Sequence, residues 1–341
     1  MRALVLDRIG HLEVAELTAT EPGPGEVQIR IAATGICGSD VHGYTGENGR
    51  RHPGQVMGHE SSGVVSAVGA GVAEVAVGDP VTFNPVVVPD DDVTEFAGRE
   101  QMSPRKRVVG VDPSWVSSFA ELVVVPARNV VPLSRDLPIE RGALIEPLAV
   151  AVHAVRRAGV QRGHRVLVVG GGPIGQSAVL ALRMAGAGAI VVSEVDRARR
   201  ELVARLGADT VDASAAGAVE EAQRLAGGQF DVAIDAVGIE PTIAAALRAT
   251  AIGGTVCLVG MGAPRLVLDA FLVSTEERTV VGSFTYSAAD FRDAAEWIAR
   301  AGDSVDALIT EQVPLADAPD AFERLARGGA VAGKIIVRLD A

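Results

Sequence analysis

Two short motifs in the first 60 residues carry side chains that bind transition metals. The first, CGSDVH, begins at Cys37, and the second, GHE, contains His59 and Glu60. Thiolate, imidazole and carboxylate are ligand types that zinc prefers, and a catalytic zinc keeps three protein ligands and one open position. Cys37 and His59 are the clearest ligands, and either Glu60 or Glu146 completes the set. The sequence therefore predicts one catalytic metal site.

A glycine-rich turn provides the second chemical signal. Gly170-Gly-Gly-Pro-Ile-Gly175 fits G-x-G-x-x-G, follows an apolar run at 165–169, and opens a helical pattern at about 174–185. Such a turn lets the backbone approach a pyrophosphate at a helix N-terminus. Glu194 ends the next apolar run, where a carboxylate accepts ribose hydroxyls and repels a 2′-phosphate. We therefore predict a dinucleotide site that favours NAD over NADP. The nearby basic residues Arg197, Arg199 and Arg200 would soften that preference.

The elements that must hold these residues change in character along the chain. Residues 1–135 alternate short strand patterns with frequent glycine and proline turns, which is typical of a mostly β unit. From about 138 to 282, apolar strand runs alternate with helical patterns, which indicates a parallel sheet with helices on both faces. A long helical stretch at 288–302 and a strand near 335 follow. The acidic run 90–92 is expected to be a solvated loop.

Composition narrows the classes of partner and compartment. The 341 residues carry a formal net charge of -12, which disfavours binding to nucleic acid. No apolar stretch reaches the roughly 18 residues of a membrane helix, so no membrane partner is expected. The two cysteines lie in unrelated contexts, and Cys257, within an apolar run, is expected to be a buried core residue. We expect a soluble cytoplasmic protein.

These motifs, together with GALIEPL at 142–148 and GHRVLV at 163–168, resemble the zinc-dependent medium-chain dehydrogenases, and most of all their sorbitol (polyol) dehydrogenase branch. The resemblance runs over nearly the whole chain. It implies an α/β fold in which a Rossmann doubly wound parallel sheet interrupts a GroES-like, mostly β catalytic domain. The expected segments are 1–155 for the first part of the catalytic domain, 156–284 for the Rossmann domain, and 285–341 for the return.

The resemblance also assigns roles to individual residues. Zinc ligands map onto Cys37 and His59, with Glu60 third in the polyol branch and Glu146 contacting the water at the metal. Asp40 corresponds to the carboxylate that orients the zinc histidine. Ser39 corresponds to the hydroxyl that touches the substrate alcohol, and His42 to the outer end of a proton relay. Cofactor-binding positions map onto Gly170, Gly172, Pro173, Ile174, Gly175, Glu194, Arg199, Val259, Gly260, Met261, Ser283, Phe284 and Thr285.

Three departures from the family pattern matter. Many relatives hold a structural zinc with four cysteines, but the positions in register here are Pro89, Asp92, Glu95 and Ser103, so no structural zinc is expected. The polyol branch has a tyrosine just after the relay histidine, where this chain has Gly43, followed by Tyr44. An arginine of that branch is Thr285 here. The last two differences leave the identity of the alcohol open.

The expected activity is zinc-dependent hydride transfer between a secondary alcohol or polyol and NAD, which gives a ketone. The alternatives are a zinc-free quinone or enone reductase of the same fold, and a non-catalytic dinucleotide-binding protein. The expected partners are a small-molecule alcohol or ketone and further copies of the chain, as a homodimer or homotetramer. The candidate interface is the apolar segment Arg265 to Val281.

Overall fold

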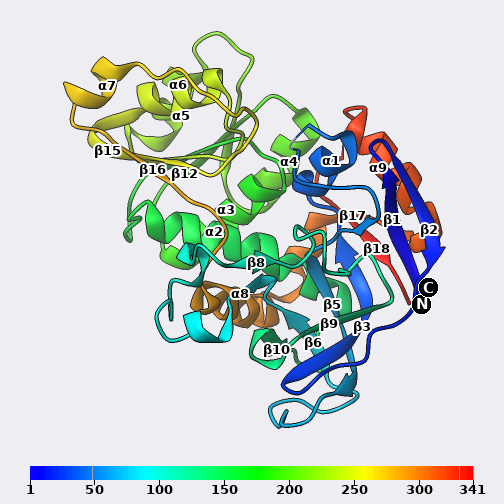
Figure 1. Ribbon diagram of the computed structural model, residues 1–341. Coiled ribbons are helices and arrows are strands. Elements are labelled where there is room, and N and C mark those ends of the chain that lie inside the picture. The colour runs from blue at the N-terminus through cyan, green and yellow to red at the C-terminus, as the bar shows by residue number, and fades with distance from the viewer. Residues whose placement is uncertain (48, 330, 341) are drawn as a thin grey trace. The chain divides into compact units, whose positions relative to one another are not determined.

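The computed structural model describes residues 1–47, 49–329 and 331–340, and its contacts divide the chain into two compact units (Figure 1). Unit 1 combines Met1–Glu146 with Tyr286–Ala341, and unit 2 is Pro147–Thr285. Unit 2 is thus an insertion in unit 1, as expected for a nucleotide domain within a β domain. The first division lies inside the helix Ile145–Arg157, most of which the sequence analysis assigned to the first segment.

Unit 1 is built on an antiparallel sheet with strand β3 at its centre. Across the described residues the strand order is β10-β6-β5-β3-β18-β17, with β9 also paired to β3, and β17 and β18 run parallel. Smaller sheets join β2-β1-β4 and β7-β8. The strands are β1 (Arg2–Arg8), β2 (His11–Glu16), β3 (Glu26–Gly35), β4 (Gln55–Val56), β5 (Glu60–Val68), β6 (Pro80–Phe83), β7 (Val86–Val87), β8 (Arg107–Val108), β9 (Leu122–Pro126), β10 (Val130–Pro132), β17 (Ile309–Pro314) and β18 (Lys334–Arg338).

The core of unit 1 lies where these strands bury their apolar residues. Val27, Ile29 and Ile31 of β3 are almost fully buried, beside Phe119 and Phe322. The rings of Phe119 and Phe322 meet edge to face, 5.5 Å between centroids. Three helices accompany the sheet: α1 (Gly38–Thr45), α8 (Ala288–Arg300) and α9 (Ala318–Ala326). The predicted stretch 288–302 corresponds to α8, whereas α9 and β17 were not predicted.

The loop after β7 differs from the prediction of a solvated acidic run. Asp90–Asp92 form a short 3-10 helix, and Asp92 is buried. The Ser103 hydroxyl donates a hydrogen bond to Asp92 at 2.6 Å, and Arg105 forms an ion pair with the same carboxylate. These contacts with Arg105 and Ser103 hold the pKa of Asp92 below its ordinary value. Two of the four positions in register with the cysteines of the relatives, Asp92 and Ser103, thus bind each other directly.

Unit 2 is a parallel sheet flanked by helices, as the alternating pattern predicts. In the part of the chain that the structure describes, the strand order is β13-β12-β11-β14-β15-β16. The strands are β11 (Val166–Val169), β12 (Ile190–Glu194), β13 (Asp209–Asp212), β14 (Phe230–Asp235), β15 (Thr250–Leu258) and β16 (Thr279–Gly282). The helices are α2 (Ile145–Arg157), α3 (Pro173–Ala185), α4 (Arg197–Arg205), α5 (Ala218–Ala226), α6 (Glu240–Ala249) and α7 (Ala270–Ser274). Of these, β13, α5 and α7 were not predicted.

Burial fits the expected role of the second cysteine. Cys257 on β15 is fully buried, and its Sγ lies 3.8 Å from the carbonyl oxygen of Ala154 on α2. Burial raises the pKa of this thiol to about 12, so it stays protonated.

None of the helices formed by the described residues is both long and apolar enough to cross a bilayer.

Candidate metal centre and nucleotide turn

Three neighbouring strands bring the metal-binding motifs together. Cys37 follows the end of β3, Glu60 begins β5, and Lys334 begins β18. In the antiparallel register, Gly35 of β3 faces Glu60 on one side and Ile336 of β18 on the other. Because β5 and β18 flank β3, Glu60 and Lys334, which are 274 positions apart in the chain, meet at one end of the sheet.

Cys37, His59 and Glu60 form a compact set of metal-ligand atoms. One ligand atom from each lies within 4.8 Å of the others, and His59 and Glu60 are buried. Adjacent residues of a straight strand point in opposite directions. Here Gly58, with φ of 99°, bends the chain just before β5, and its lack of a Cβ avoids a clash with the backbone nitrogen of Phe119. The bend at Gly58 thus comes just before both residues, and the ligand atoms of His59 and Glu60 lie within 4.8 Å of each other.

A buried ion pair flanks this cluster. The Lys334 ammonium donates a hydrogen bond to Glu60 Oε1 at 2.7 Å and lies 2.6 Å from Oε2. A Cβ on Gly35 would overlap the Glu60 carboxylate and would lie 3.2 Å from Lys334 Cδ. Glycine is therefore required at position 35, because the ion pair passes over β3 there. The Glu60 charge, with that of Cys37, raises the pKa of Lys334 in spite of its burial.

Asp40 lies behind the histidine of the cluster. Its Oδ1 is 3.6 Å from His59 Nδ1 and 3.4 Å from a guanidinium nitrogen of Arg51, and its Oδ2 accepts the backbone N–H of Cys37 at 3.3 Å. Asp40 is fully buried. A carboxylate facing Nδ1 fixes the ring so that the other nitrogen is available to a metal. This position agrees with the orienting role that the resemblance implies.

Glu146 approaches the cluster from a different segment, the first turn of α2. Its Oε1 accepts a hydrogen bond from the hydroxyl of Tyr286 at 2.8 Å, and both side chains are buried. Burial and the neighbouring Glu60 raise the pKa of Glu146 to about 7, although His59 acts in the opposite direction. Burial and Glu146 also raise the pKa of Tyr286, which keeps that hydroxyl a hydrogen-bond donor.

The charges around the cluster can accommodate a divalent cation. Burial alone would lower the pKa of His59, but Asp40 and Cys37 raise it to about 10, so a metal would have to displace its proton. With that proton gone and the acids ionised, four negative side chains would face two cations, and the excess of two negative charges would match one divalent ion. The acids are Cys37, Asp40, Glu60 and Glu146, and the cations are Arg51 and Lys334.

The two residues of the expected proton relay share one face of α1. Ser39 and His42 are three positions apart, the spacing that places side chains side by side on a helix. Ser39 is partly buried, whereas half of the His42 side chain is exposed, and His42 Nδ1 lies 2.6 Å from Glu47 Oε2. The order from interior to solvent is the one that a relay would need.

The glycine-rich turn of unit 2 has the geometry of a dinucleotide site. Gly170 has φ of 98°, Gly172 precedes the first turn of α3, and Pro173 occupies that turn. A Cβ on Gly175 would overlap the carbonyl oxygen of Gly170, so glycine allows the close packing of helix against turn. The backbone N–H groups at the start of α3 are thus left to face an anion.

Glu194 supports this turn directly. Its Oε2 accepts the N–H of Gly171 at 2.7 Å, and its Oε1 accepts the N–H of Asp196 at 2.8 Å. Of the three nearby arginines, Arg197 pairs with Glu201, and Arg200 pairs with Asp212 and donates to the Glu194 carbonyl oxygen. Arg199 is the one whose guanidinium lies near Gly172. Two of the three arginines, Arg197 and Arg200, therefore pair with carboxylates other than that of Glu194.

The other predicted cofactor positions also lie in unit 2. Ile174 is in the first turn of α3, and Val259, Gly260 and Met261 directly follow β15. Ser283, Phe284 and Thr285 follow β16. The Ser283 hydroxyl is buried without a hydrogen-bond partner among the described residues, and Thr285 has φ of 53°.

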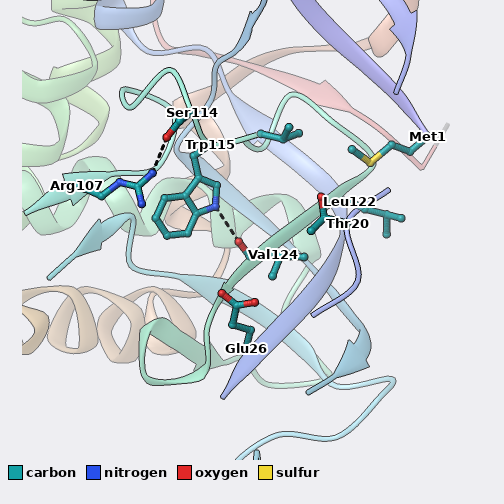
Figure 2. A pocket seen from close by; sticks show the side chains of 9 residues that line it. Met1, Thr20, Glu26, Arg107, Ser114, Trp115, Leu122 and Val124 are labelled. Atoms are coloured by element: carbon teal, nitrogen blue, oxygen red, sulfur yellow. Dashed lines mark hydrogen bonds between the residues drawn. The ribbon is translucent and has the colours of Figure 1, made fainter. Parts of the chain in front are cut away.

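A pocket elsewhere in unit 1 contains no member of the metal cluster. It has a volume of about 300 Å³, and Figure 2 shows Trp115 at its wall with the indole nitrogen donating to the Val124 carbonyl oxygen at 2.9 Å. Arg107 lies over the Trp115 ring, 4.7 Å from its centroid, and donates to the Ser114 hydroxyl at 2.8 Å. These contacts hold the pocket wall together.

Comparison with known proteins fits both halves of this arrangement. Residues 23–135 match the family model described as an alcohol dehydrogenase GroES-like domain, and residues 173–300 match the model described as a zinc-binding dehydrogenase. Sorbitol dehydrogenase of Gallus gallus is 35% identical over 346 residues, which covers 99% of this chain and 96% of that protein. The chain belongs to the zinc-binding alcohol dehydrogenase family.

Solved structures of zinc-binding dehydrogenases and their relatives share the fold. The chain is similar to 2R,3R-butanediol dehydrogenase from Bacillus subtilis, with a TM-score of 0.89, 29% identity and 99% of both chains covered. It is also similar to a zinc-binding dehydrogenase from Sinorhizobium meliloti bound to NADP, with a TM-score of 0.90, 31% identity and 99% of both chains covered. The medium-chain fold predicted from the sequence is thereby confirmed.

The residues of the cluster fit the metal that gives this dehydrogenase family its name. A thiol, an imidazole and a carboxylate whose ligand atoms lie within 4.8 Å of one another are donor types that zinc prefers, and the acidic groups around them can balance a divalent cation. The sequence analysis named these three residues as candidates but did not name Arg51, Tyr286 or Lys334 as their neighbours. Their signal was weak, since a charged residue at the start of an apolar strand, such as Lys334 before Ile-Ile-Val, usually faces solvent.

We predict one zinc per chain, bound with release of protons. In the metal-free protein, the raised pKa values of Glu146, about 7, and His59, about 10, mean that bound protons stabilise the fold at low pH. That stabilisation is lost as pH rises through those values, and zinc must displace the His59 proton. The rise in Tm caused by zinc should therefore be larger at pH 8 than at pH 6. Elemental analysis gives the stoichiometry. An equal rise in Tm at both pH values, or two zinc ions per chain, would contradict this prediction.

Proposed function

We propose that this dehydrogenase oxidises a secondary alcohol or polyol to a ketone, with one zinc and with NAD as hydride acceptor. The observation that carries the proposal is the meeting of Cys37, His59 and Glu60 at one buried point. Bound zinc supplies a Lewis acid that favours loss of the alcohol proton. The relatives named for sorbitol and for 2R,3R-butanediol both act on compounds with adjacent hydroxyl groups, which supports a polyol or vicinal diol as substrate.

The chain's own residues then have separate tasks in the proposed reaction. Ser39 accepts the proton of the alcohol hydroxyl, and His42, one helical turn further on, passes it to solvent. Asp40 keeps the His59 ring oriented. Glu146, held by Tyr286, positions water or substrate at the metal. The buried cluster excludes bulk water, which strengthens each of these electrostatic interactions.

The preference for NAD rests on Glu194. Its carboxylate is buried against the glycine-rich turn, and two backbone N–H groups stabilise its charge. A 2′-phosphate at this place would bring two negative groups together in a site of low dielectric constant. Arg199 is the one arginine near the turn that would favour NADP, the cofactor bound by the relative from Sinorhizobium meliloti.

The direct test is a panel of secondary alcohols, vicinal diols, polyols and amino alcohols, each assayed with NAD and with NADP by nicotinamide absorbance. We expect turnover with zinc and a higher kcat/KM for NAD. Glu194→Ala should narrow the difference between the cofactors, because the repulsion of the 2′-phosphate is removed. Glu201→Ala, at an exposed glutamate of α4 that pairs with Arg197, is the matched control and should leave the ratio unchanged. A wild-type preference for NADP would reject the assignment of Glu194.

The same assay separates the rival functions. A zinc-free quinone or enone reductase would keep its activity after metal removal, and a non-catalytic dinucleotide-binding protein would bind NAD without turnover. The gathered ligand set favours the zinc enzyme over both. The loss of activity on metal removal and its return with zinc would decide between these functions.

Glu60 is the proposed third ligand, and Glu146 the residue at the metal-bound water. Glu60 belongs to the compact set with Cys37 and His59, whereas Glu146 is bound by Tyr286. Glu60→Gln should weaken zinc binding by roughly 10–100-fold, because even the loss of a residue that only hydrogen-bonds to a metal ligand has an effect of that size. Glu146→Gln should retain zinc and lower kcat. Zinc retention after dialysis against a mild chelator, measured with turnover, distinguishes the two. Loss of zinc from Glu146→Gln alone would reverse the assignment.

A reducing, cytoplasmic location follows from the same proposal, because Cys37 must remain a free thiol to bind a metal, and both cysteines are free.

Assembly through β16 is also proposed. This strand ends the sheet of unit 2 and is uncharged, whereas the opposite edge, β13, begins and ends with aspartate. Charged residues protect an edge strand from pairing, so β16 is the edge that is open to a second copy.

The segment Arg265 to Val281, which precedes and includes most of β16, carries exposed apolar side chains. Phe271 is 77% exposed and Val267 68%. Patches of this kind mark protein interfaces. We therefore expect a dimer or tetramer, and Phe271→Asp should shift the mass measured by light scattering towards the monomer. Val77→Asp, at an exposed valine of unit 1, is the control. A monomeric wild type at working concentration would reject this interface.

A further inference from the structure

Arg51 is a buried cation that the proposed reaction has not yet used. Its side chain is 1% exposed, and a guanidinium stays protonated at all relevant pH values. Placing such a charge in a protein interior costs free energy unless an anion and hydrogen bonds compensate it. The compensation here is sparse. Asp40 lies 3.4 Å away, and Arg51 Nε has no hydrogen-bond partner among the described residues.

The anion that Arg51 faces is the one behind the metal-binding histidine. Asp40 Oδ1 is shared between Arg51, at 3.4 Å, and His59 Nδ1, at 3.6 Å. The three side chains thus form a chain from a permanent cation, through a fully buried carboxylate, to a metal ligand. Asp40 cannot turn away from His59 without also leaving Arg51, since both contacts use the same oxygen.

The sequence makes room for this arginine in α1. A Cβ on Gly43 would overlap Arg51 Cγ, and it would lie 3.2 Å from Arg51 Cβ. Gly43 is buried in the last turn of α1, and glycine within a helix costs roughly 1 kcal/mol relative to alanine. The helix that carries Ser39, Asp40 and His42 therefore gives up stability at the point where the Arg51 stem passes.

We propose that Arg51 is a positioning residue that acts through Asp40 on His59, and that the pair Gly43 and Arg51 sets the affinity and electronic environment of the metal site. The guanidinium holds the Asp40 carboxylate at Nδ1, so that the other ring nitrogen of His59 can point at a metal. The inference rests on the proposed zinc site. Arg51 would orient Asp40, and Asp40 would in turn orient the metal ligand His59. A residue that orients a ligand needs a partner that holds it in place.

Two opposing effects make the outcome of a substitution informative. The positive charge of Arg51 repels a nearby cation, so its removal alone would tighten zinc binding. The loss of orientation at Asp40 and His59 would weaken it, by about tenfold or more if Arg51 acts like other residues that position ligands. Our proposal requires that the second effect dominate.

The experiment compares Arg51→Met, Arg51→Lys and Gly43→Ala with the wild type. Zinc affinity is measured by competition with a chelator, and the visible absorption of the Co²⁺-substituted protein reports the ligand field directly. Arg51→Met should lose about tenfold or more in zinc affinity and should shift the Co²⁺ bands. Arg51→Lys should recover part of both. Gly43→Ala should change them in the same direction, because its methyl group displaces the arginine without removing a charge.

Arg141→Met is the matched control. Arg141 is also buried in unit 1, paired with Asp303 at 2.7 Å and Asp306 at 2.6 Å, and it is no part of the metal cluster. Its loss should lower Tm and leave the zinc affinity and the Co²⁺ spectrum unchanged. If Arg51→Met folds poorly, Gly43→Ala carries the test.

Unchanged or tighter zinc binding with an unchanged Co²⁺ spectrum, in both Arg51→Met and Gly43→Ala, would overturn the role of Arg51 while leaving the zinc site intact. A wild type that binds no zinc would overturn the site itself, and the inference with it. The two failures are thus distinguishable.

Discussion

Neutralisation of buried charge at one end of the unit 1 sheet is the constraint on which the rest of the site depends. Asp40 and Glu60 are fully buried, and Arg51 and Lys334 are almost so. Burying even one unpaired ion costs several kcal/mol, so each charge must meet its partner at close range. The partners come from segments far apart in sequence, and the fold has to deliver all of them to one place.

Glycines are the means by which the backbone accommodates these pairs. Gly35 lets the Lys334–Glu60 pair cross the central strand, Gly43 lets the Arg51 stem pass α1, and Gly58 bends the chain just before His59 and Glu60. In each case the missing Cβ lies where a charged side chain or another backbone segment has to be. A compact ionic site therefore fixes glycine at positions that look unremarkable in a chain with 39 of them.

Motifs made of neighbouring residues could be predicted from the sequence, whereas contacts between residues far apart in the chain could not. The glycine-rich turn, with a strand before it and a helix after it, could be recognised because all its parts are contiguous, and the ligand motifs at 37–42 and 58–60 are short. Lys334 lies 274 residues from Glu60, and no spacing rule connects them. Arg51 follows another arginine and precedes a histidine, and nothing in that sequence context distinguishes a buried arginine from an exposed one.

The prediction that the run 90–92 is solvated holds for Asp90 and Asp91, whose side chains are 89% and 70% exposed, and was wrong for the buried Asp92. Three consecutive aspartates suggest solvent, but Ser103, eleven residues after Asp92, donates a hydrogen bond to its carboxylate, and Arg105 forms an ion pair with it. A carboxylate, a hydroxyl and a guanidinium thus hold this loop together. Composition alone could not separate the buried aspartate from its exposed neighbours.

The periodicity of apolar residues did not lead to a prediction of strand β17, although its six residues alternate partly buried and exposed, because the run is short and ends in proline.

The two buried cations, Lys334 and Arg51, affect the site in different ways. Lys334 contacts Glu60, a candidate ligand, through both carboxylate oxygens, so it competes directly with any metal for that negative charge. Arg51 contacts Asp40, which lies behind a ligand, so it affects a metal only through the histidine. A carboxylate shared with an ammonium donates less charge to a metal than a free one, and a cation held by such ligands stays a stronger Lewis acid. The fold thus keeps enough negative charge at the cluster to bind a divalent ion, and enough positive charge beside it that the ion is not fully neutralised.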